Sequence, residues 1–172
     1  MNYNQMNGLA SQIPIGSEGL TILPFGNGAE RMLGNQDSGC RMAGINFNVH
    51  NKAHVLRAAQ EGIVFSFAYG IEIMEAIGIT PSVIRAGNAN MFLSPVFKEA
   101  LASTTGATIE LYDTDGSQGA ALASGFGAGI YKSFGEAFQN LKKLETVYPD
   151  SSKRNAYRDA YHAWNDQLKK NG

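Results

Sequence analysis

Strands alternate with helices through the second half of this 172-residue sequence, and that alternation constrains the fold more than any other feature. A β-type run at 82–86 precedes a helical pattern at 91–103. A second run at 108–112 precedes a helical pattern from about 115 to 131. Consecutive strands separated by helices are joined by crossovers and lie parallel in one sheet. The pattern therefore predicts an α/β fold.

The first half of the sequence is organised around one long helix, expected from Lys52 to Ile77 after the capping residues of 48–51. Its middle, Ile63 to Ile71, is apolar nearly all round, which predicts a helix buried between other elements. Shorter elements are expected at 1–12 (a helix), at 20–23 and 42–47 (strands) and at 25–39 (a loop rich in Gly, Asn and Asp).

The last helix, expected at 151–169, carries large apolar side chains at helical spacing. These side chains belong to Tyr157, Tyr161, Trp164 and Leu168. Such a stripe is typical of an amphipathic helix that packs on the body of its own protein, rather than of a membrane or partner helix. Neither a linker nor an internal repeat interrupts the sequence, so we expect residues 1–172 to form a single domain.

Composition excludes several classes of function. The net charge is −1, so the basic surface of a nucleic-acid-binding protein is absent. Cys40 is the one cysteine, which excludes an internal disulfide and suggests a reducing compartment. No signal peptide opens the sequence, and its longest nearly apolar run, Gly62 to Ile71, is shorter than the roughly 20 residues of a membrane span. We expect a soluble, cytoplasmic protein that binds neither nucleic acid nor membrane.

Glycine is abundant and charge is scarce: 20 of 172 residues are glycine, and charged residues make up 17%. The usual shares are about 7% and about 25%. Four glycines at 119, 125, 127 and 129 are expected to allow close helix packing. The scarcity of charge suggests a face that meets another domain or a second copy of the chain, so a homodimer is an open expectation.

Metal and nucleophile chemistry find little support in the sequence. His50 and His54 are four residues apart, but the Glu that would follow His50 in a zinc-protease motif is missing. Asp113 begins an Asp-Thr-Asp-Gly run like that of a calcium loop, yet Gln118 and Ser124 occupy the positions where Gly and Glu are required. We expect structural histidines, a helix cap at Asp115 and no metal site in this chain.

Two strand-to-helix corners are the best candidates for a ligand site. The turn from Gly87 to Asn90 joins a strand to a helix, where free backbone N–H groups and the positive end of the helix dipole favour an anion. The corner from Asp115 to Gly119 opens on the same edge of the sheet, and such neighbouring corners form a crevice that suits a nucleotide. On these residues alone, an ordinary corner capped by Asn90 is equally well supported.

Four segments resemble conserved motifs of the FGGY carbohydrate kinases, in the same order. Gly19–Phe25 with Glu30-Arg31 resembles that family's GLLFLPY…GER segment, and His54–Gly62 resembles its H-x-x-R-A-x-x-E-G helix. Val83–Leu93 resembles its adenosine motif, and Asp115–Ala123 resembles the Gly-Ala-Ala helix that follows. The resemblance extends over nearly the whole chain.

The resemblance implies the second of two domains of the ribonuclease-H and actin-like ATPase type, with a mixed sheet flanked by helices. It further implies binding of ATP or ADP, with Mg²⁺ held mainly through the nucleotide and the other domain. The implied contacts are Ala86, Gly87, Asn88, Ala89, Asn90 and Gly116. The family's Gly-Gly-Gly-Ala appears here as Arg85-Ala86-Gly87-Asn88, so two glycines are replaced.

In the family, the first domain carries most of the sugar site and the aspartate that acts as general base. We expect that domain to be absent here, so that this chain holds no catalytic residue, meets its sugar only with the N-terminal domain and is inactive alone. The resemblance favours xylulose as the sugar. A non-catalytic actin-like module for assembly or regulation is the alternative.

Overall fold

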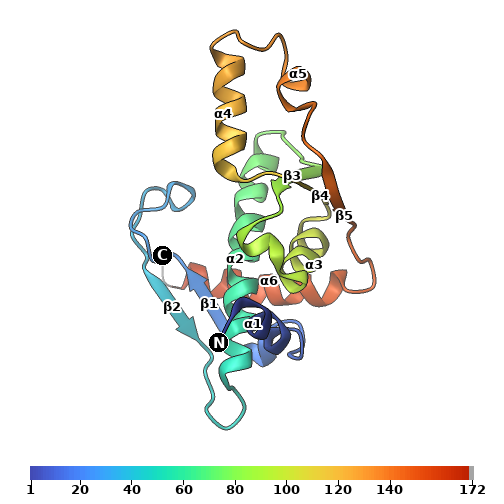
Figure 1. The fold of residues 1–172 in the computed structure, drawn as a ribbon. Helices are drawn as coiled ribbons and strands as arrows, with labels where there is room; N and C mark the ends of the chain where they lie inside the picture. Colours follow the sequence, from blue (N-terminus) through green and yellow to red (C-terminus); the bar gives the residue numbers. More distant parts are fainter. Residues whose placement is uncertain (171–172) are drawn as a thin grey trace.

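The helix α2 (Lys52–Ala76) runs through the middle of the molecule (Figure 1). In the computed structural model, which describes residues 1–170, the side chain of Asn51 accepts a hydrogen bond of 2.8 Å from the backbone N–H of Ala53. This bond satisfies one of the unpaired donors at the start of the helix. The predicted helix is therefore confirmed, with its expected cap.

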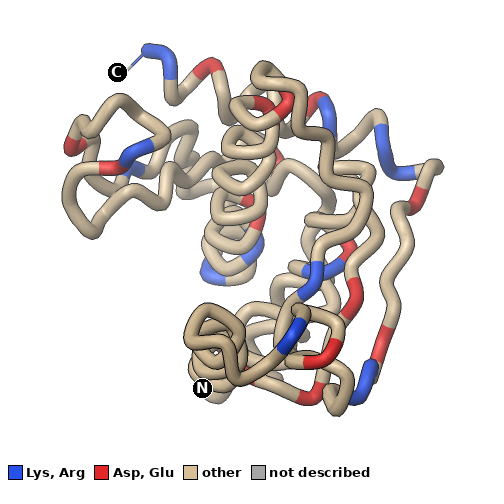
Figure 2. Tube along the Cα trace, turned by 90° about the horizontal axis from the view of Figure 1, so that it is seen from above, with Lys and Arg blue, Asp and Glu red and all other residues tan. Residues whose placement is uncertain are grey.

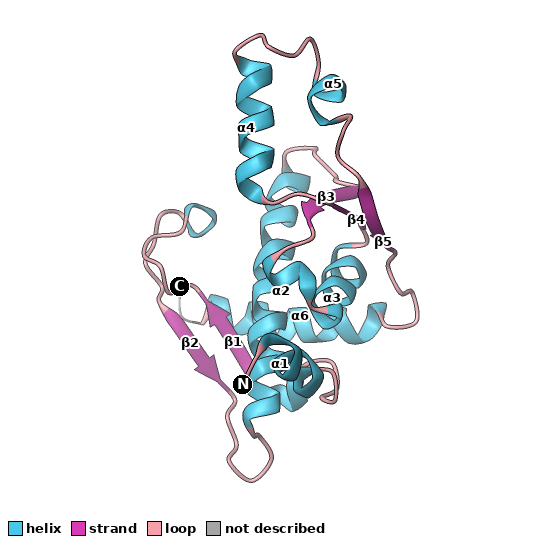
Figure 3. Cartoon of the chain, in the orientation of Figure 1, coloured by secondary structure: helices cyan, strands magenta, loops and turns pink. Residues whose placement is uncertain are grey.

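A mixed sheet of three strands, β3 (Val83–Gly87), β4 (Thr108–Tyr112) and β5 (Lys143–Val147), lies in the order β3-β4-β5. β3 and β4 are parallel, and β5 is antiparallel to β4. The crossover between the parallel strands contains α3 (Pro95–Thr105), which packs against α2 (Figure 3). The predicted α/β fold with a mixed sheet flanked by helices is confirmed.

A second, separate sheet pairs β1 (Thr21–Pro24) with β2 (Cys40–Ala43) in antiparallel register. The strand expected at 42–47 is therefore misplaced. β2 ends at Ala43 because the next residue, Gly44, has a φ of 75°, which is incompatible with an extended strand. Glycine is required at this position, since a side chain would collide with the carbonyl oxygen of Gly19. The remaining helices are α1 (Tyr3–Ala10), α4 (Gly116–Gly127), α5 (Phe134–Phe138) and α6 (Arg154–Lys169), with three 3₁₀ helices at Ser17–Gly19, Arg31–Leu33 and Asn90–Leu93.

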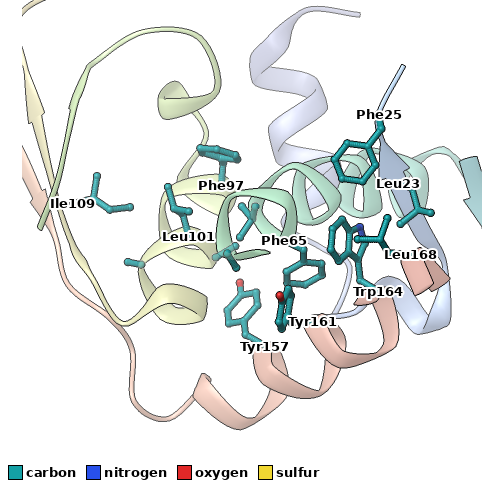
Figure 4. Packing of buried hydrophobic residues seen from close by; sticks show 14 of the residues in the cluster. Leu23, Phe25, Phe65, Phe97, Leu101, Ile109, Tyr157, Tyr161, Trp164 and Leu168 are labelled. Atoms are coloured by element: carbon teal, nitrogen blue, oxygen red, sulfur yellow. The ribbon is translucent and has the colours of Figure 1, made fainter. Parts of the chain in front are cut away.

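The core lies between α2, α3 and α6 and extends to β1 at one end and β4 at the other (Figure 4). The four apolar residues of the predicted stripe on α6 are all buried, and Trp164 donates from Nε1 to the carbonyl oxygen of Ile22 at 2.9 Å. Trp164 also packs against Phe25 and Phe65, with ring centroids 6.0 and 6.2 Å apart. The amphipathic α6 therefore docks on the body of the protein, as predicted.

The expected burial of the apolar middle of α2 is confirmed for Val64, Phe65 and Ala68 but not for the whole circumference of the helix. Phe67, in the middle of its apolar stretch, is 52% exposed, whereas Arg57 and Glu61 in the polar first half are 5% and 2% exposed. The first half is covered by α1, β1 and α6, and Phe67 contacts α3 through the edge of its ring against Phe97, at a centroid distance of 6.5 Å. Apolar composition therefore did not decide which side of the helix is buried, because the covering elements come from distant parts of the sequence.

The buried charges of Arg57 and Glu61 on α2 belong to one hydrogen-bonded network. Arg57 donates to Glu61 at 2.7 Å and to the hydroxyl of Tyr157 at 3.0 Å. Glu61 also accepts from the backbone N–H of Gly16 and the hydroxyl of Ser17. Burial raises the pKa of Glu61 although Arg57 opposes the shift. A buried charge is tolerated only when it is paired in this way.

The start of α3 also corrects a prediction. The helix expected at 91–103 begins instead at Pro95, and its cap is Ser94, whose hydroxyl accepts from the N–H of Phe97 at 3.3 Å. Proline disfavours a helical conformation in the residue before it, so the helix cannot run through Ser94. Asn90 is not a helix cap; it has a φ of 54° and opens a short 3₁₀ helix.

The helix α4 is capped by Asp115 as predicted, but it ends at Gly127 rather than near Tyr131. Gly129 has a φ of 75°, and the N–H groups of Gly129 and Ile130 donate back to Phe126 and Gly125. These bonds form a Schellman ending. The prediction that glycines allow close helix packing is wrong for Gly119 and Gly127. A methyl group added to either residue would meet no atom within 4 Å.

Charged residues are spread thinly along the chain (Figure 2), and none lies between Asp115 and Lys132. Within residues 1–170, no helix is both long enough and apolar enough to cross a lipid bilayer.

Candidate functional site

The ends of β3 and β4 meet at a point where only glycine fits. A Cβ atom added to Gly87 would collide with the carbonyl oxygen of Thr114 and lie 3.1 Å from the Cα of Asp115. Because the two strands are parallel, their carboxyl ends lie at the same edge of the sheet. The absence of a side chain at Gly87 thus allows the two predicted corners to touch. The group that approaches the Gly87 backbone is the corner at Thr114 and Asp115, not a ligand.

A cavity of about 720 Å³ opens beside these corners. Its volume lies within the roughly 300–1,000 Å³ of ordinary ligand pockets. Its lining is mostly glycine and apolar side chains: Arg85, Ala86, Gly87, Tyr112, Thr114, Asp115, Gly116, Gly119, Phe134, Gly135, Phe138 and Leu141. The predicted crevice between neighbouring corners is therefore present, at the carboxyl ends of β3 and β4.

The amino end of α4 forms one side of the cavity. Asp115 caps the helix by accepting from the N–H of Gln118 at 2.9 Å and from the hydroxyl of Ser117 at 2.6 Å. These hydrogen bonds lower the pKa of Asp115, so its carboxylate stays charged at neutral pH. The cap uses one of the helix's free donors, and the helix dipole attracts an anion at this end while the Asp115 charge opposes it.

A ladder of charges crosses the sheet at the other side of the cavity. Arg85 on β3 donates from Nε to Glu110 on β4 at 2.9 Å. Tyr112 and Lys143 also donate to the Glu110 carboxylate, at 2.9 and 3.0 Å. The hydrogen bonds from Lys143, Arg85 and Tyr112 lower the pKa of Glu110 to about 2.

The third wall is α5, a helix that is absent from the elements expected along the sequence. Ser133 caps it, with the hydroxyl accepting from the N–H of Glu136 at 3.1 Å. Phe134 and Phe138 lie four residues apart with ring centroids at 6.1 Å, and Phe134 packs against Phe126 of α4 at 4.2 Å. The Ser-x-x-Glu spacing of 133–136 is a known helix-start signal and could have revealed this helix.

Only some of the residues predicted to contact a nucleotide lie at the cavity. Ala86, Gly87 and Gly116 line the cavity. Asn88 and Ala89 do not, and their backbone N–H groups donate to the carbonyl oxygens of Tyr112 and Gly87, at 2.9 Å each. The donors expected to be free at this turn are therefore already used within the protein.

Asn90 lies beside a different hollow. That cavity, of about 300 Å³, is lined by residues of α1, α2 and the 3₁₀ helix Asn90–Leu93. Asn90 does not line the first cavity.

His50 and His54 both form hydrogen bonds with other residues of the protein. The N–H of Asn46 donates to Nδ1 of His50, whose Nε2 therefore carries the proton and faces the carbonyl oxygen of Glu18 at 3.2 Å. Nε2 of His54 lies 2.6 Å from the Glu18 carboxylate. Across the described residues 1–170, no group of three or more His, Cys, Asp or Glu side chains is placed to hold a metal ion.

No protein-family model matches the sequence. The chain is 27% identical over 172 residues to the xylulose kinase of Haemophilus influenzae, covering 95% of this chain and 34% of that protein. It is 29% identical over 167 residues to the L-xylulose/3-keto-L-gulonate kinase of Escherichia coli, covering 95% of this chain and 32% of that protein. The chain thus spans about a third of the length of the curated relatives it matches.

Solved structures of sugar kinases share the fold. A ligand-bound xylulose kinase from Lactobacillus acidophilus matches with a TM-score of 0.79 and 19% identity over 96% of this chain. The glycerol kinase of Plasmodium falciparum, solved with ADP, matches with a TM-score of 0.73 and 19% identity over 99% of this chain. Each match covers 34% of the solved chain. The present chain therefore has the actin-like ATPase fold found in these kinases.

Proposed function

We propose that these residues form the nucleotide-binding part of an ATP-dependent sugar kinase, a C-terminal domain of the FGGY type. The cavity at the carboxyl ends of β3 and β4 carries this proposal, because parallel sheets bind ligands at that edge. Similarity to sugar kinases along 95% of the chain supports it.

In this proposal the nucleoside end of ATP or ADP enters the cavity past Ala86 and Gly87. The phosphates extend toward Gly116 at the amino end of α4, where the helix dipole attracts negative charge against the opposing charge of the Asp115 cap. Asn88 and Ala89 then act on the ligand indirectly, because their N–H groups hold the turn that presents Gly87, and Asn90 has no contact with the ligand in this proposal.

The reaction proposed for the complete kinase is phosphorylation of D-xylulose by ATP, giving D-xylulose 5-phosphate and ADP. Two of the similar proteins are named for xylulose or L-xylulose, which supports this choice of sugar. Phosphoryl transfer depends on positioning and on charge stabilisation around the transferred group. The part played by this chain is to bind and orient the nucleotide.

Mg²⁺ is the metal implied by this chemistry, and the described residues offer it no cluster of ligands. We therefore assign it to no residue of this chain. Mg²⁺ commonly binds through substrate phosphates with only one or two carboxylates. No side chain here is assigned as general base either, so we propose that the 172-residue chain alone does not phosphorylate sugar.

The surface proposed to meet the rest of the kinase lies along the carboxyl-terminal half of α2 and the start of β3. Exposed apolar side chains in this part of the sequence are Phe67, Ile73, Met74, Ile77, Ile79 and Val83. Exposed apolar side chains promote association where they adjoin one another. We expect the free chain to form dimers through this surface, and a monomer at high concentration in light scattering would contradict that expectation.

Calorimetric titration of the chain with ADP tests the nucleotide site directly. Saturable binding that is weakened by Gly87→Ala, with Gly127→Ala as a control outside the cavity, is the expected result. A coupled assay with D-xylulose and ATP tests the second part, and turnover by this chain alone would contradict it.

A non-catalytic actin-like module is the second candidate, and Arg85 with Ala86 in place of two glycines favours it. Absence of any saturable heat with ADP would support this module over the kinase.

A further inference from the structure

Arg85 is the one cationic side chain among the described residues that line the cavity. Its side chain is 69% exposed, so it lies at the mouth rather than in the depth of the cavity. An exposed arginine is normally free to sample many rotamers, which makes it a poor recognition group. The contacts of this arginine remove much of that freedom.

Glu110 holds the Arg85 guanidinium in place. The Nε–H group donates to Oε2 of Glu110 at 2.9 Å, and the Glu110 side chain is only 16% exposed. Glu110 is itself fixed, because Tyr112 and Lys143 donate to its two carboxylate oxygens. The guanidinium is therefore oriented before any ligand arrives, which lowers the entropic cost of using it.

The two ends of the cavity differ chemically. One end is the amino end of α4 with Gly116, where the helix dipole attracts phosphate and the Asp115 carboxylate opposes it. Arg85 lies two residues before Gly87, which corresponds to about 6.6 Å along the strand at about 3.3 Å per residue. Phe134, Phe138 and Leu141 provide apolar walls for the same cavity. A ligand with an anionic end and a planar, apolar end would fit this arrangement.

We propose that Arg85 covers the base of the bound nucleotide, with the plane of its guanidinium stacked on the ring, and that Glu110 is the positioning residue for this contact. The inference rests on the proposed function, because it assumes that the cavity binds a nucleotide. Arginine stacks on aromatic faces through its delocalised, weakly hydrated plane, whereas lysine offers only a compact charge. A glycine at this position would let the base approach the backbone closely. In this proposal the base contacts the Arg85 side chain instead.

The competing role for the same side chain is an ion pair with the phosphates. The two roles differ in what they require of the ligand and of the protein. A stacked base needs the planar guanidinium but no phosphate, so adenosine and ADP depend on Arg85 to the same degree. A phosphate contact needs only positive charge, so ADP alone would depend on it and lysine would substitute.

The test measures binding of ADP and adenosine to the full 172-residue chain by calorimetry. Arg85→Ala should weaken both ligands by the same factor, about tenfold, within the range found when a stacking side chain is removed. Arg85→Lys should lose nearly as much, and Glu110→Gln should weaken both by about threefold, because it releases the guanidinium. Arg158→Ala, which removes an exposed arginine paired with Asp159 on α6, is the matched control and should change neither ligand.

Three outcomes would overturn the stacking role: a loss by Arg85→Ala that affects ADP but spares adenosine, full rescue by lysine, or unchanged binding of both ligands. In each of these the proposed nucleotide site survives. If the unsubstituted chain binds neither ligand, the proposed function itself fails and the role of Arg85 fails with it. Thermal unfolding of Arg85→Ala should match that of the unsubstituted chain, which separates a ligand contact from a structural role.

Discussion

Two arginine–glutamate pairs of nearly equal length lie in opposite surroundings. Arg57 and Glu61, 2.7 Å apart on α2, are buried in the body, whereas Arg85 and Glu110, 2.9 Å apart on β3 and β4, line the open side of the sheet. Water screens the second pair but not the first. The comparison teaches that the same contact holds the fold together in one region and orients a side chain toward a cavity in the other.

The elements around the two pairs differ in the same way. The helix α2 buries ten of its residues, whereas α4 beside the cavity buries Gly125 alone among its described residues. In Figure 1, α4 and α5 stand away from the body formed by α2, α3 and α6. Ligand-binding segments are commonly drawn from the less stable parts of a fold, so we expect the cavity walls to open before the body unfolds.

Breaking the buried pair should produce the largest effect. Arg57→Met leaves Glu61 and the hydroxyl of Tyr157 without their cationic partner, and it should lower the free energy of unfolding by about 3–5 kcal/mol. Urea denaturation followed by circular dichroism measures the change. A loss as small as that of the exposed control Arg158→Ala would contradict the structural role given to the buried pair.

Two glycines on α2 sharpen the contrast between packed and open surroundings. A methyl group at Gly62 would collide with the carbonyl oxygen of Ile22, so Gly62→Ala should destabilise the protein by about 1–3 kcal/mol or more. Gly70→Ala, on the same helix, meets no atom within 4 Å and should stabilise it by about 0.5–1 kcal/mol. Equal effects in thermal melts would show that β1 does not press on α2.

Gly87→Ala tests the same kind of close contact beside the cavity. The added methyl group would force the two corners apart, and we expect a destabilisation of about 1 kcal/mol, near the lower limit for overpacking, because the site lies at the edge of the sheet. The effect on ADP affinity should be larger than that on stability. Amide hydrogen exchange would locate the change, which should be confined to β3, β4 and α4 if the cavity region is independent of the body.

The smallest expected effect concerns the exposed pair. The pKa of Glu110 is lowered to about 2, from about 4.3 for an ordinary glutamate, so the charged ladder stabilises the folded state above that ordinary value. The contribution is lost as the pH falls toward 2. NMR titration of the Glu110 carboxyl carbon should show this low pKa, and Lys143→Ala should raise it. An unshifted value would mean that the ladder does not persist in solution.

Much of the local structure could be predicted because its signals are local. Asn51 and Asp115 cap the helices that they precede, and the side chains of 157–168 line the buried face of α6. The strand–helix alternation gave the fold class and the position of the crevice. Each of these signals depends on side chains within a few residues of one another, which is the range over which capping and periodicity operate.

The candidate site was only partly predictable, since its walls come from separate elements. Gly87 and Gly116 are predictable from their corners, whereas the place of Arg85 at the mouth of the cavity depends on the fold. Asn90 is expected at the site from its turn and from the resemblance, but it opens a 3₁₀ helix beside the second cavity, and α3 begins only at Pro95. The Ser133 cap and Pro95 are local signals for the starts of α5 and α3.

The sequence by itself determined the long helices, the strands β1, β3 and β4, their order along the chain and the glycine at the meeting point of two strands, but neither α5 nor β5. The tertiary structure alone decided which surfaces are buried: it covered Arg57 and Glu61, left Phe67 exposed and brought Tyr157 to a partner a hundred residues away. The physical reason is that capping and propensity act between neighbours along the chain, whereas burial and charge pairing depend on groups that meet only after folding.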